Sequence, residues 1–316
     1  MTYRIPLPAG GRTDRLDIVE PNSTAVQRFL RRDGLCAYEP PTIAALLALF
    51  EQADPGFTFF DVGANMGLYA LVAATMFESA HVHAFEPTPS TVRVLRKVVS
   101  ANDAAVDVID AATSDTTGTA MLHFSNASDA SNSLVAGFKD SRGGTEVMTI
   151  RVDDHVRQSG VRPDIMKIDV ETFEPAVLHG ARRTIETARP HIVIEVLNRR
   201  GHDHGEEITA AMAEHGYVYY RLGEEPDWSP RDVVTGTPGS RHNDWLLAPG
   251  ELDDAFPELV ARWRTRLSDC TPERNSRVPI GRSVAAAMRR GGVSEVVATV
   301  KRYAASVRRE RDRPSS

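Results

Sequence analysis

The segment that decides the fold reads FDVGANMG, from Phe60 to Gly67. It closes the apolar run FTFFDV at 57–62, which is typical of a buried strand, and precedes LYALVAATMF at 68–77, which has helical periodicity. Glycines directly after a strand permit a tight turn, and they bring backbone N–H groups close to a ligand at the start of the next helix. The segment therefore predicts a strand–turn–helix unit with a ligand at the turn.

Strands and helices alternate along the chain after this unit. The alternation predicts βαβ units and a mostly parallel sheet with helices on both faces. The polar stretch at 113–148 is predicted to form loops and short hairpins near the site. The expected strands are HVHAFEP (81–87), VDVIDAA (106–112), DIMKIDV (164–170), HIVIEV (191–196), YVYYRL (217–222) and WLLAP (near 245), and the expected helices are STVRVLRKVVSAN (90–102), EPAVLHGARRTIETA (174–188) and EEITAAMAEHG (206–216), the last ending at Gly216.

The chain divides into three predicted parts: a lead-in at 1–55 with a helix at 40–53, the main domain at 56–250, and a basic helical extension at 251–316. From Arg274 onward there are 11 Lys and Arg residues against 3 Asp and Glu. Within this C-terminal extension, the segment SEVVATVKRYAASVRRE places its Val, Ala and Tyr side chains on one helical face. Such a helix can contact a membrane surface or an acidic partner, or it can pack on the acidic body of its own chain.

Composition sets further limits. The 316 residues are 41% hydrophobic and 25% charged, as in soluble globular proteins. A net charge of −6 disfavours bulk binding to nucleic acid. The two cysteines, Cys36 and Cys270, form no C-x-x-C pair, so a thiolate zinc site is excluded. No secretory signal opens the sequence and no apolar run reaches the ~18 residues of a membrane span, so we expect a cytoplasmic protein.

The ligand at the turn is expected to carry a nucleoside. Glu86 ends the second strand 23 residues beyond Gly63, and an acid at that position can hold both ribose hydroxyls. A dinucleotide motif requires glycines where this chain has Asn65 and Leu68, which disfavours NAD and an oxidoreductase. Asp61 would repel a pyrophosphate but could orient an ammonium group. S-adenosylmethionine, which has a ribose, an ammonium and a sulfonium, fits these acids. The alternative is an ordinary strand–turn–helix unit that binds no ligand.

Several segments together resemble the FkbM-type S-adenosylmethionine-dependent methyltransferases. The resemblance covers about 35–250, and it implies a class I methyltransferase (Rossmann-like) fold with a seven-stranded sheet whose last strand is antiparallel. It also implies O-methylation of a hydroxyl on a sugar, a glycan or a polyketide. One departure is Thr172, where the family usually has glycine. The segments are FFDVGANMGLYALVAA, HAFEPTP, the SD-x-x-G of Ser114–Gly118, MKIDVETFEPAVLHGA and RPHIVIEV.

The resemblance also implies roles for single residues. Glu86 would bind the ribose, and Ser114 and Asp115 would lie near the adenine, although Asp115 also fits a solvated polar turn. The segment that includes Glu39 is similar to one that folds over the cofactor, the alternative being a plain helix-entry turn. The methionine end of the cofactor would be lined by Asp61, Gly63, Asn65 and Gly67.

The candidate catalytic residues follow the fourth and fifth strands, because such sheets bind ligands at the carboxyl ends of their strands. Asp169 and Glu171 end the fourth strand, and Glu195 lies in the apolar fifth strand, where a carboxylate is costly unless it is paired or functional. Glu195 could instead fix a loop or Lys167. Glu174 fits either the site or a helix-dipole role.

Histidines follow the fifth strand in RGHDHG, at 200–205. His202 or His204 could accept the proton of the methyl acceptor, since histidine titrates near neutral pH. The two histidines could also bind a metal together with Asp169 and Asp203, or they could belong to a solvated loop. We assign no metal to the site. The sequence thus predicts an S-adenosylmethionine-dependent O-methyltransferase acting on a small-molecule or glycan acceptor. The alternative from another class is a cofactor-binding scaffold that recruits a partner through its basic tail.

Overall fold

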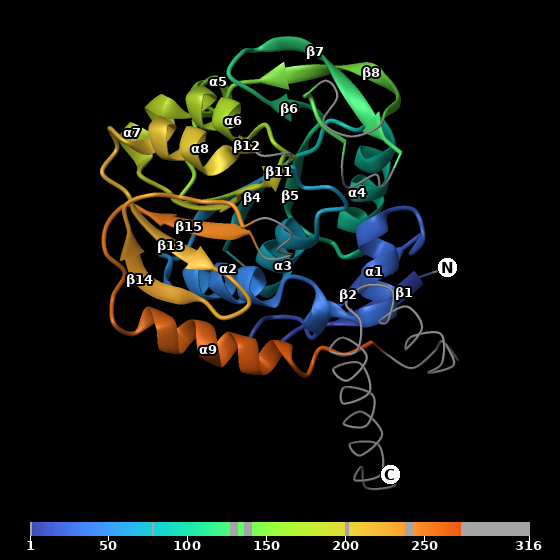
Figure 1. Ribbon diagram of the computed structural model, residues 1–316. Helices are drawn as coiled ribbons and strands as arrows, with labels where there is room; N and C mark the ends of the chain where they lie inside the picture. The colour runs from blue at the N-terminus through green and yellow to red at the C-terminus, as the bar shows by residue number, and fades with distance from the viewer. Residues whose placement is uncertain are drawn as a thin grey trace, which may run out of the picture. The chain divides into compact units, whose positions relative to one another are not determined.

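The computed structural model describes residues 2–77, 79–126, 132–135, 141–199, 202–237 and 243–272. These residues belong to one compact unit, Met1–Pro272. The predicted basic helix at 294–310 lies outside the described residues, and the predicted division at residues 55 and 250 stays a prediction. Figure 1 shows the arrangement of the elements.

A central sheet of eight strands organises the unit, in the order β14-β13-β15-β10-β9-β3-β4-β5. Neighbours from β10 to β5 are parallel, whereas β15 runs antiparallel between β10 and β13. The prediction of a mostly parallel sheet with an antiparallel last strand is confirmed. The strands are β3 (Thr58–Val62), β4 (His81–Phe85), β5 (Val106–Ile109), β9 (Ile165–Ile168), β10 (His191–Glu195), β13 (Val218–Leu222), β14 (Asp227–Arg231) and β15 (Asp244–Ala248).

The predicted count of seven strands is one too low, because β14 adds an edge strand beside β13. Its sequence, DWSPR, is polar and mostly exposed, and it contains Pro230. Proline is tolerated at a sheet edge because the edge leaves backbone N–H groups unpaired in any case. Apart from Trp228, which packs against the core, the strand therefore lacks the apolar character by which the other strands were predicted.

Helices cover both faces of the sheet, as predicted, and they pack into two separate hydrophobic clusters. One face carries α2 (Pro40–Gln52), α3 (Leu68–Met76) and α4 (Pro89–Ala101). The other carries α5 (Val152–Ser159), α6 (Glu174–Gly180), α7 (Arg182–Ala188) and α8 (His204–Met212). Because the strands are buried on both sides, β3 and β15 have no exposed residue.

The N-terminal segment builds structure that the sequence did not indicate. A hairpin of β1 (Thr2–Pro6) and β2 (Arg15–Val19) leads into α1 (Ala25–Asp33) and the short 3-10 helix η1 (Leu35–Ala37). A capping box starts α1, in which Thr24 and Gln27 each bond the other's backbone N–H. α2 is buried almost throughout because it lies between the sheet and α9 (Phe256–Leu267), which runs alongside it in Figure 1.

The polar stretch at 113–148 forms a small sheet of its own, ordered β6-β8-β7. β7 (Gly118–Ser125) and β8 (Ser141–Ile150) are the hairpin expected there, and β8 also pairs with β6 (Ala112–Thr113). Two further strands of two residues each, β11 (Asn198–Arg199) and β12 (His202–Asp203), pair with one another before α8.

Two helix predictions are corrected. The helix expected at 174–188 is broken at Ala181 into α6 and α7. Gly180, next to the break, packs so closely on Ser114 that a Cβ there would lie 2.0 Å from its carbonyl oxygen. The helix expected to end at Gly216 ends at Met212, four residues earlier. It also begins earlier, because the side chain of Asp203 caps it by accepting the N–H of Gly205 at 2.9 Å.

Candidate active site

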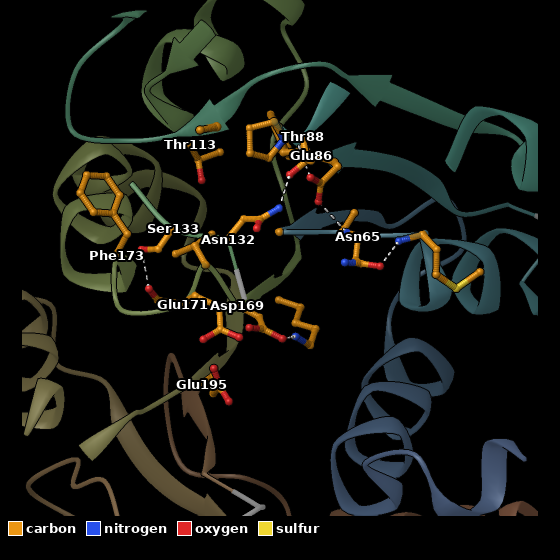
Figure 2. A pocket seen from close by; sticks show the side chains of 18 of the residues that line it. Asn65, Glu86, Thr88, Thr113, Asn132, Ser133, Asp169, Glu171, Phe173 and Glu195 are labelled. Carbon is orange, nitrogen blue, oxygen red and sulfur yellow. Dashed lines mark hydrogen bonds and ion pairs between the residues drawn. The ribbon is translucent and has the colours of Figure 1, made fainter. Parts of the chain in front are cut away.

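A cavity lies at the carboxyl ends of β3, β4, β9 and β10, at the edge of the sheet where the ligand was expected. Figure 2 shows two groups of side chains in it: Glu86, Thr88 and Thr113 towards one end, and Asp169, Glu171 and Glu195 towards the other. The predicted site residues that line it are Glu39, Gly63, Asn65, Glu86, Asp169, Glu171 and Glu195. Those that do not line it are Asp61, Gly67, Ser114, Asp115 and His204.

The turn after β3 has the geometry expected from its glycines. Gly63 has a φ of 84°, and a Cβ there would lie 1.8 Å from the backbone oxygen of Asp169, so no side chain fits. The N–H groups of Gly63 and Ala64 both bond the carbonyl oxygen of Phe85. Gly67 does not reach the cavity. It is the residue before α3 and has a φ of 84°, and a Cβ there would lie 2.3 Å from the side chain of Leu95.

Asp61 lies beneath this turn, outside the cavity wall. Its carboxylate accepts the N–H of Ala70 at 2.9 Å, which fixes the first turn of α3 against β3. Burial raises the pKa of Asp61 to about 6, against the lowering effect of Lys167 and the Ala70 N–H group. The expected orientation towards an ammonium group is not the one in the structure, because the helix provides a backbone donor closer by.

Glu86 occupies the position expected for a ribose-binding acid. One carboxylate oxygen accepts the N–H of Asn65 at 2.9 Å, and the other accepts the N–H of Thr88 at 2.8 Å. Burial raises the pKa of Glu86 to about 7, despite these hydrogen bonds. Because an ionised carboxylate has about four lone-pair directions, both oxygens retain capacity for a hydroxyl donor. Asn65, at a φ of 50°, also caps its neighbour by accepting the N–H of Met66.

Thr113 reaches the cavity where Ser114 and Asp115 were expected. The Thr113 hydroxyl is buried and has no hydrogen-bond partner in the described part of the chain. Ser114 is turned away: its hydroxyl donates to Asp115 at 3.1 Å, and its carbonyl lies against Gly180. Asp115 is exposed.

Lys167 is a buried lysine at the end of the cavity that holds Asp169, Glu171 and Glu195. Its ammonium lies 2.8 Å from the carboxylate of Asp169 and 4.7 Å from the ring centre of Tyr69. Burial opposes its charge, but Asp169, Glu39, Asp244 and Asp61 outweigh this and raise the pKa of Lys167. Lys167 therefore stays charged and holds Asp169 in place rather than acting as a base.

Glu195 ends β10 and lines the same end of the cavity. Its pKa is raised well above the ordinary value, first by burial and then by the charges of Asp169, Glu171, Asp244 and Glu174. A carboxyl with a raised pKa can accept a proton near neutral pH. Lys167, the structural partner considered for Glu195, is paired with Asp169.

The loop after β9 is strained and is held by a buried acid. Glu171 has a φ of 55° and Thr172 a φ of 79°, a conformation that is costly for a β-branched residue. Glu174 accepts the N–H groups of Val170 at 3.0 Å and of Thr172 at 3.3 Å. Burial raises the pKa of Glu174 to about 8. The glycine expected at position 172 thus corresponds to a real backbone requirement, and Glu174 supports the loop in addition to its place at the start of α6.

Glu39 enters the cavity from the N-terminal segment, at the residue before α2. The hydroxyl of Tyr69 donates to its carboxylate. Burial and the charge of Asp244 raise the pKa of Glu39, while Lys167 and the Tyr69 hydrogen bond lower it. Glu39 therefore connects the lead-in to α3 at the edge of the cavity.

His204, which follows β10, lies elsewhere. His204 begins α8 and its ring nitrogen is 3.8 Å from Glu207, outside the cavity lining. The side chain of His202 lies outside the described set. Among the described residues, no group of three or more His, Cys, Asp or Glu side chains could hold a metal ion. The expectation that His204 takes the acceptor proton is not supported by its placement.

Two cavity residues were missed because they come from the polar stretch. Asn132 donates to the Thr88 hydroxyl at 3.4 Å, and Ser133 donates to the carbonyl oxygen of Glu171 at 2.8 Å. They bridge the two ends of the cavity, as the dashed lines in Figure 2 show. No sequence pattern marks them. Lys167, in contrast, could have been found, because a lysine inside the apolar strand IMKI needs a buried partner.

These residues fit a sulfonium nucleoside. Glu86 has free acceptor capacity for the ribose hydroxyls, the Thr113 hydroxyl needs a partner, and Gly63 lines the cavity without a side chain. Among the described residues that line the cavity, five are carboxylates and one, Lys167, is a lysine or arginine. The sheet, with β15 antiparallel between β10 and β13, is that of the class I methyltransferases.

The chain belongs to the FkbM methyltransferase family. The family model, described as "Methyltransferase FkbM domain", matches residues 61–219. The family is S-adenosylmethionine-dependent, and S-adenosylmethionine is therefore the cofactor that this site accommodates. The match spans β3 to β13 and so includes every strand end that lines the cavity.

Curated relatives are similar at low identity. The chain is 26% identical over 196 residues to the 31-O-demethyl-FK506 methyltransferase FkbM of Streptomyces tacrolimicus, covering 53% of this chain and 75% of that one. It is 28% identical over 149 residues to the hexuronic acid methyltransferase AglP of Haloferax volcanii, covering 47% and 59%. It is 26% identical over 201 residues to the methyltransferase sdnD of Sordaria araneosa, covering 54% and 76%.

Among solved structures, a methyltransferase FkbM from Methylobacillus flagellatus is similar with a TM-score of 0.42 and 15% identity. The similarity covers 62% of this chain and 44% of that one. In the part of the chain that the structure describes, no helix is both long and apolar enough to span a membrane.

Proposed function

We propose that the protein transfers the methyl group of S-adenosylmethionine to a hydroxyl oxygen of a sugar, a glycan or a polyketide-type natural product. The observation that carries the proposal is that the carboxylates of Asp169, Glu171 and Glu195 line the same cavity as the ribose-type acid Glu86. The printed names of two relatives, one acting on a demethylated FK506 and one on a hexuronic acid, agree with oxygen-rich acceptors.

The bound cofactor supplies an electrophilic methyl group on a positively charged sulfur. In this proposal Glu86 binds the ribose hydroxyls, Thr113 lies at the adenine side, and Gly63 with Asn65 lets the backbone approach the cofactor. Glu39 closes the cavity from the N-terminal side. Orientation of the acceptor oxygen accounts for much of the rate in a displacement of this kind.

An alcohol must also lose its proton. Glu195 is the residue that we assign as general base, because it lines the cavity and its pKa is raised by burial and by four neighbouring acids. Asp169 is paired with Lys167 at 2.8 Å, and we assign to it the orientation of the acceptor. A base in hydrogen-bond reach contributes roughly 10²–10⁴-fold to the rate.

The test has two stages. Calorimetry with S-adenosylhomocysteine first measures cofactor binding, which we expect in the micromolar range from the polar contacts available. Mass spectrometry then follows a gain of one methyl group on a panel of neutral sugars, uronic acids and macrolide alcohols. Glu195→Gln should lower kcat with little change in S-adenosylhomocysteine affinity. Failure to bind S-adenosylhomocysteine would overturn the proposal.

A further inference from the structure

A short segment of the polar stretch connects the two ends of the cavity. We call residues 132–135 the bridging segment, of which Asn132, Ser133 and Leu134 line the cavity. The segment is fixed to β7, because Ser133 and His123 exchange backbone hydrogen bonds of 2.9 and 3.2 Å. Ser133 is only 3% exposed, so its hydroxyl depends on partners inside the protein.

Asn132 fixes the bridging segment at the cofactor end. Its side-chain oxygen accepts the N–H of Ser125 at 3.0 Å, and its side-chain nitrogen donates to the Thr88 hydroxyl at 3.4 Å. The N–H of Thr88 in turn donates to Glu86 at 2.8 Å. The position of Ser133, the next residue, is therefore set by contacts on both of its sides.

The Ser133 hydroxyl acts both as a donor and as an acceptor. It donates to the carbonyl oxygen of Glu171 at 2.8 Å and accepts the N–H of Val135 at 3.1 Å. Because a serine hydroxyl has one proton, this proton is committed to the Glu171 carbonyl. Figure 2 shows the bond joining the bridging segment to the loop after β9.

The carbonyl that Ser133 binds belongs to the peptide unit between Glu171 and Thr172, which have φ values of 55° and 79°. The N–H of the same peptide unit donates to the buried carboxylate of Glu174 at 3.3 Å. Ser133 and Glu174 therefore hold the two opposite sides of one peptide unit. Rotation of this unit to the opposite orientation, the change that distinguishes type I′ from type II′ turns, would give Thr172 an ordinary negative φ. It would also break both hydrogen bonds.

The orientation of this peptide unit affects the acceptor end of the cavity. Asp169 and Glu171 line the cavity from this loop, and Asp169 is also held by Lys167 at 2.8 Å. Glu171 belongs to the peptide unit itself, so its direction changes when the unit rotates. A β-branched residue at position 172 makes the observed orientation costly, whereas glycine would adopt it without strain. The contact from Ser133 opposes this cost.

We propose that Ser133 is a positioning residue for methyl transfer: its hydroxyl keeps the peptide unit between Glu171 and Thr172 in the observed orientation, and so keeps Glu171 at the cavity wall where the acceptor binds. This inference rests on the proposed function. Ser133 acts through the loop and does not have to touch the reacting atoms. Without its hydroxyl, Glu174 alone opposes the strain at Thr172, and the loop also adopts the rotated orientation.

Steady-state kinetics of methyl transfer tests the proposal. With S-adenosylmethionine and an acceptor that the wild-type protein methylates, Ser133→Ala should lower kcat at least about tenfold, because a small misplacement in a displacement reaction costs up to about 10²-fold. The KM for S-adenosylmethionine and the affinity for S-adenosylhomocysteine should stay within about threefold, since the contacts of Glu86 are retained. Ser133→Thr keeps the hydroxyl and should restore most of the lost kcat.

Ser159→Ala is the matched control. The Ser159 hydroxyl has the same bonding pattern, since it donates to the carbonyl oxygen of His155 at 2.8 Å and accepts the N–H of Val161 at 3.2 Å. It is exposed at the end of α5 and does not line the cavity. This variant should leave kcat unchanged.

Thr172→Gly separates the effect on the peptide unit from a general loss of packing. Glycine adopts the φ of 79° without strain, so in the Thr172→Gly background Ser133→Ala should lower kcat by no more than about threefold. Hydrogen exchange of the peptide 168–178, measured without acceptor, follows the same loop directly. Exchange of its protected amides should be at least about tenfold faster in Ser133→Ala, and the increase should be smaller in the Thr172→Gly background.

The outcomes separate this inference from the proposed function. An unchanged kcat in Ser133→Ala, or a Ser133→Thr variant as slow as Ser133→Ala, would overturn the inference and leave the proposed function intact. Equal losses with and without Thr172→Gly would overturn it as well. If the wild-type protein binds the cofactor but methylates no acceptor, the proposed function fails, and unchanged hydrogen exchange of the loop in Ser133→Ala would then overturn the hold of Ser133 on the peptide unit.

Discussion

Replacing Thr172 by glycine is expected to stabilise the protein. Thr172 has a φ of 79°, where a residue other than glycine costs about 1–3 kcal/mol. Its buried hydroxyl has no hydrogen-bond partner in the described part of the chain, and such a group costs about 1–3 kcal/mol. Against these gains stand the loss of the β-carbon and the γ-methyl group, about 1.6 kcal/mol together, and the greater freedom of glycine in the unfolded chain, about 0.4–1 kcal/mol. The net expectation is about 1–3 kcal/mol in favour of Thr172→Gly.

Thr172→Ala separates the backbone effect from the hydroxyl. Alanine removes the hydroxyl and the methyl group but keeps the strained backbone, so the glycine variant should exceed the alanine variant by about 1–2 kcal/mol. Urea denaturation followed by circular dichroism measures both, and the slope of unfolding free energy against denaturant should not change. At an ordinary backbone conformation glycine is the less stable of the two. A glycine variant no more stable than the alanine variant would show that the loop is not strained at this residue.

Three further perturbations test the site. Glu86→Gln should weaken S-adenosylhomocysteine binding at least about tenfold in calorimetry, since a charge-assisted hydrogen bond contributes about 1.5–3 kcal/mol. The affinity of the wild-type protein for S-adenosylhomocysteine should fall as the pH drops below the Glu86 pKa of about 7, and the variant should lack this pH dependence. Gly63→Ala should abolish cooperative thermal unfolding, because the added Cβ would lie 1.8 Å from a backbone oxygen. The control Gly160→Ala has a φ of 74° but no atom within 4 Å of the added Cβ, and it should lower the free energy of unfolding by only about 1 kcal/mol. Lys167→Met should destabilise by about 3–5 kcal/mol in urea titrations because it leaves Asp169 unpaired, and adding Asp169→Asn should recover part of the loss.

The turn after β3 could be predicted from sequence because its chemistry is local. Glycine at positions 63 and 67 is required by positive φ values of 84°, and the acid at the end of β4 lies beside β3 in any parallel sheet of this order. The inner strands of the central sheet were equally predictable, since two-sided burial makes their sequences apolar, whereas the polar edge strand β14 was not. The family resemblance contributed the antiparallel last strand, which no local pattern indicates.

Side-chain direction could not be predicted in the same way. Asp61 was expected to face the ligand, but the N–H of Ala70 is available to it at 2.9 Å from the helix that follows. Ser114 was expected beside the adenine, but its backbone lies against Gly180, which comes more than sixty residues later in the chain. In both cases the decisive contact is with an element whose position depends on tertiary packing.

The segment before β3 shows how much of the cavity depends on such packing. Val26, Tyr38 and Glu39 all line it, although they precede the family match. Glu39 has a φ of 40°, and Pro40, the first residue of α2, suits the start of a helix. The position of α2 is in turn fixed by α9, which packs along it from the other end of the chain. The N-terminal wall of the cavity therefore depends on residues 256–267 as well as on the turn after β3, since α2 lies between α9 and the sheet.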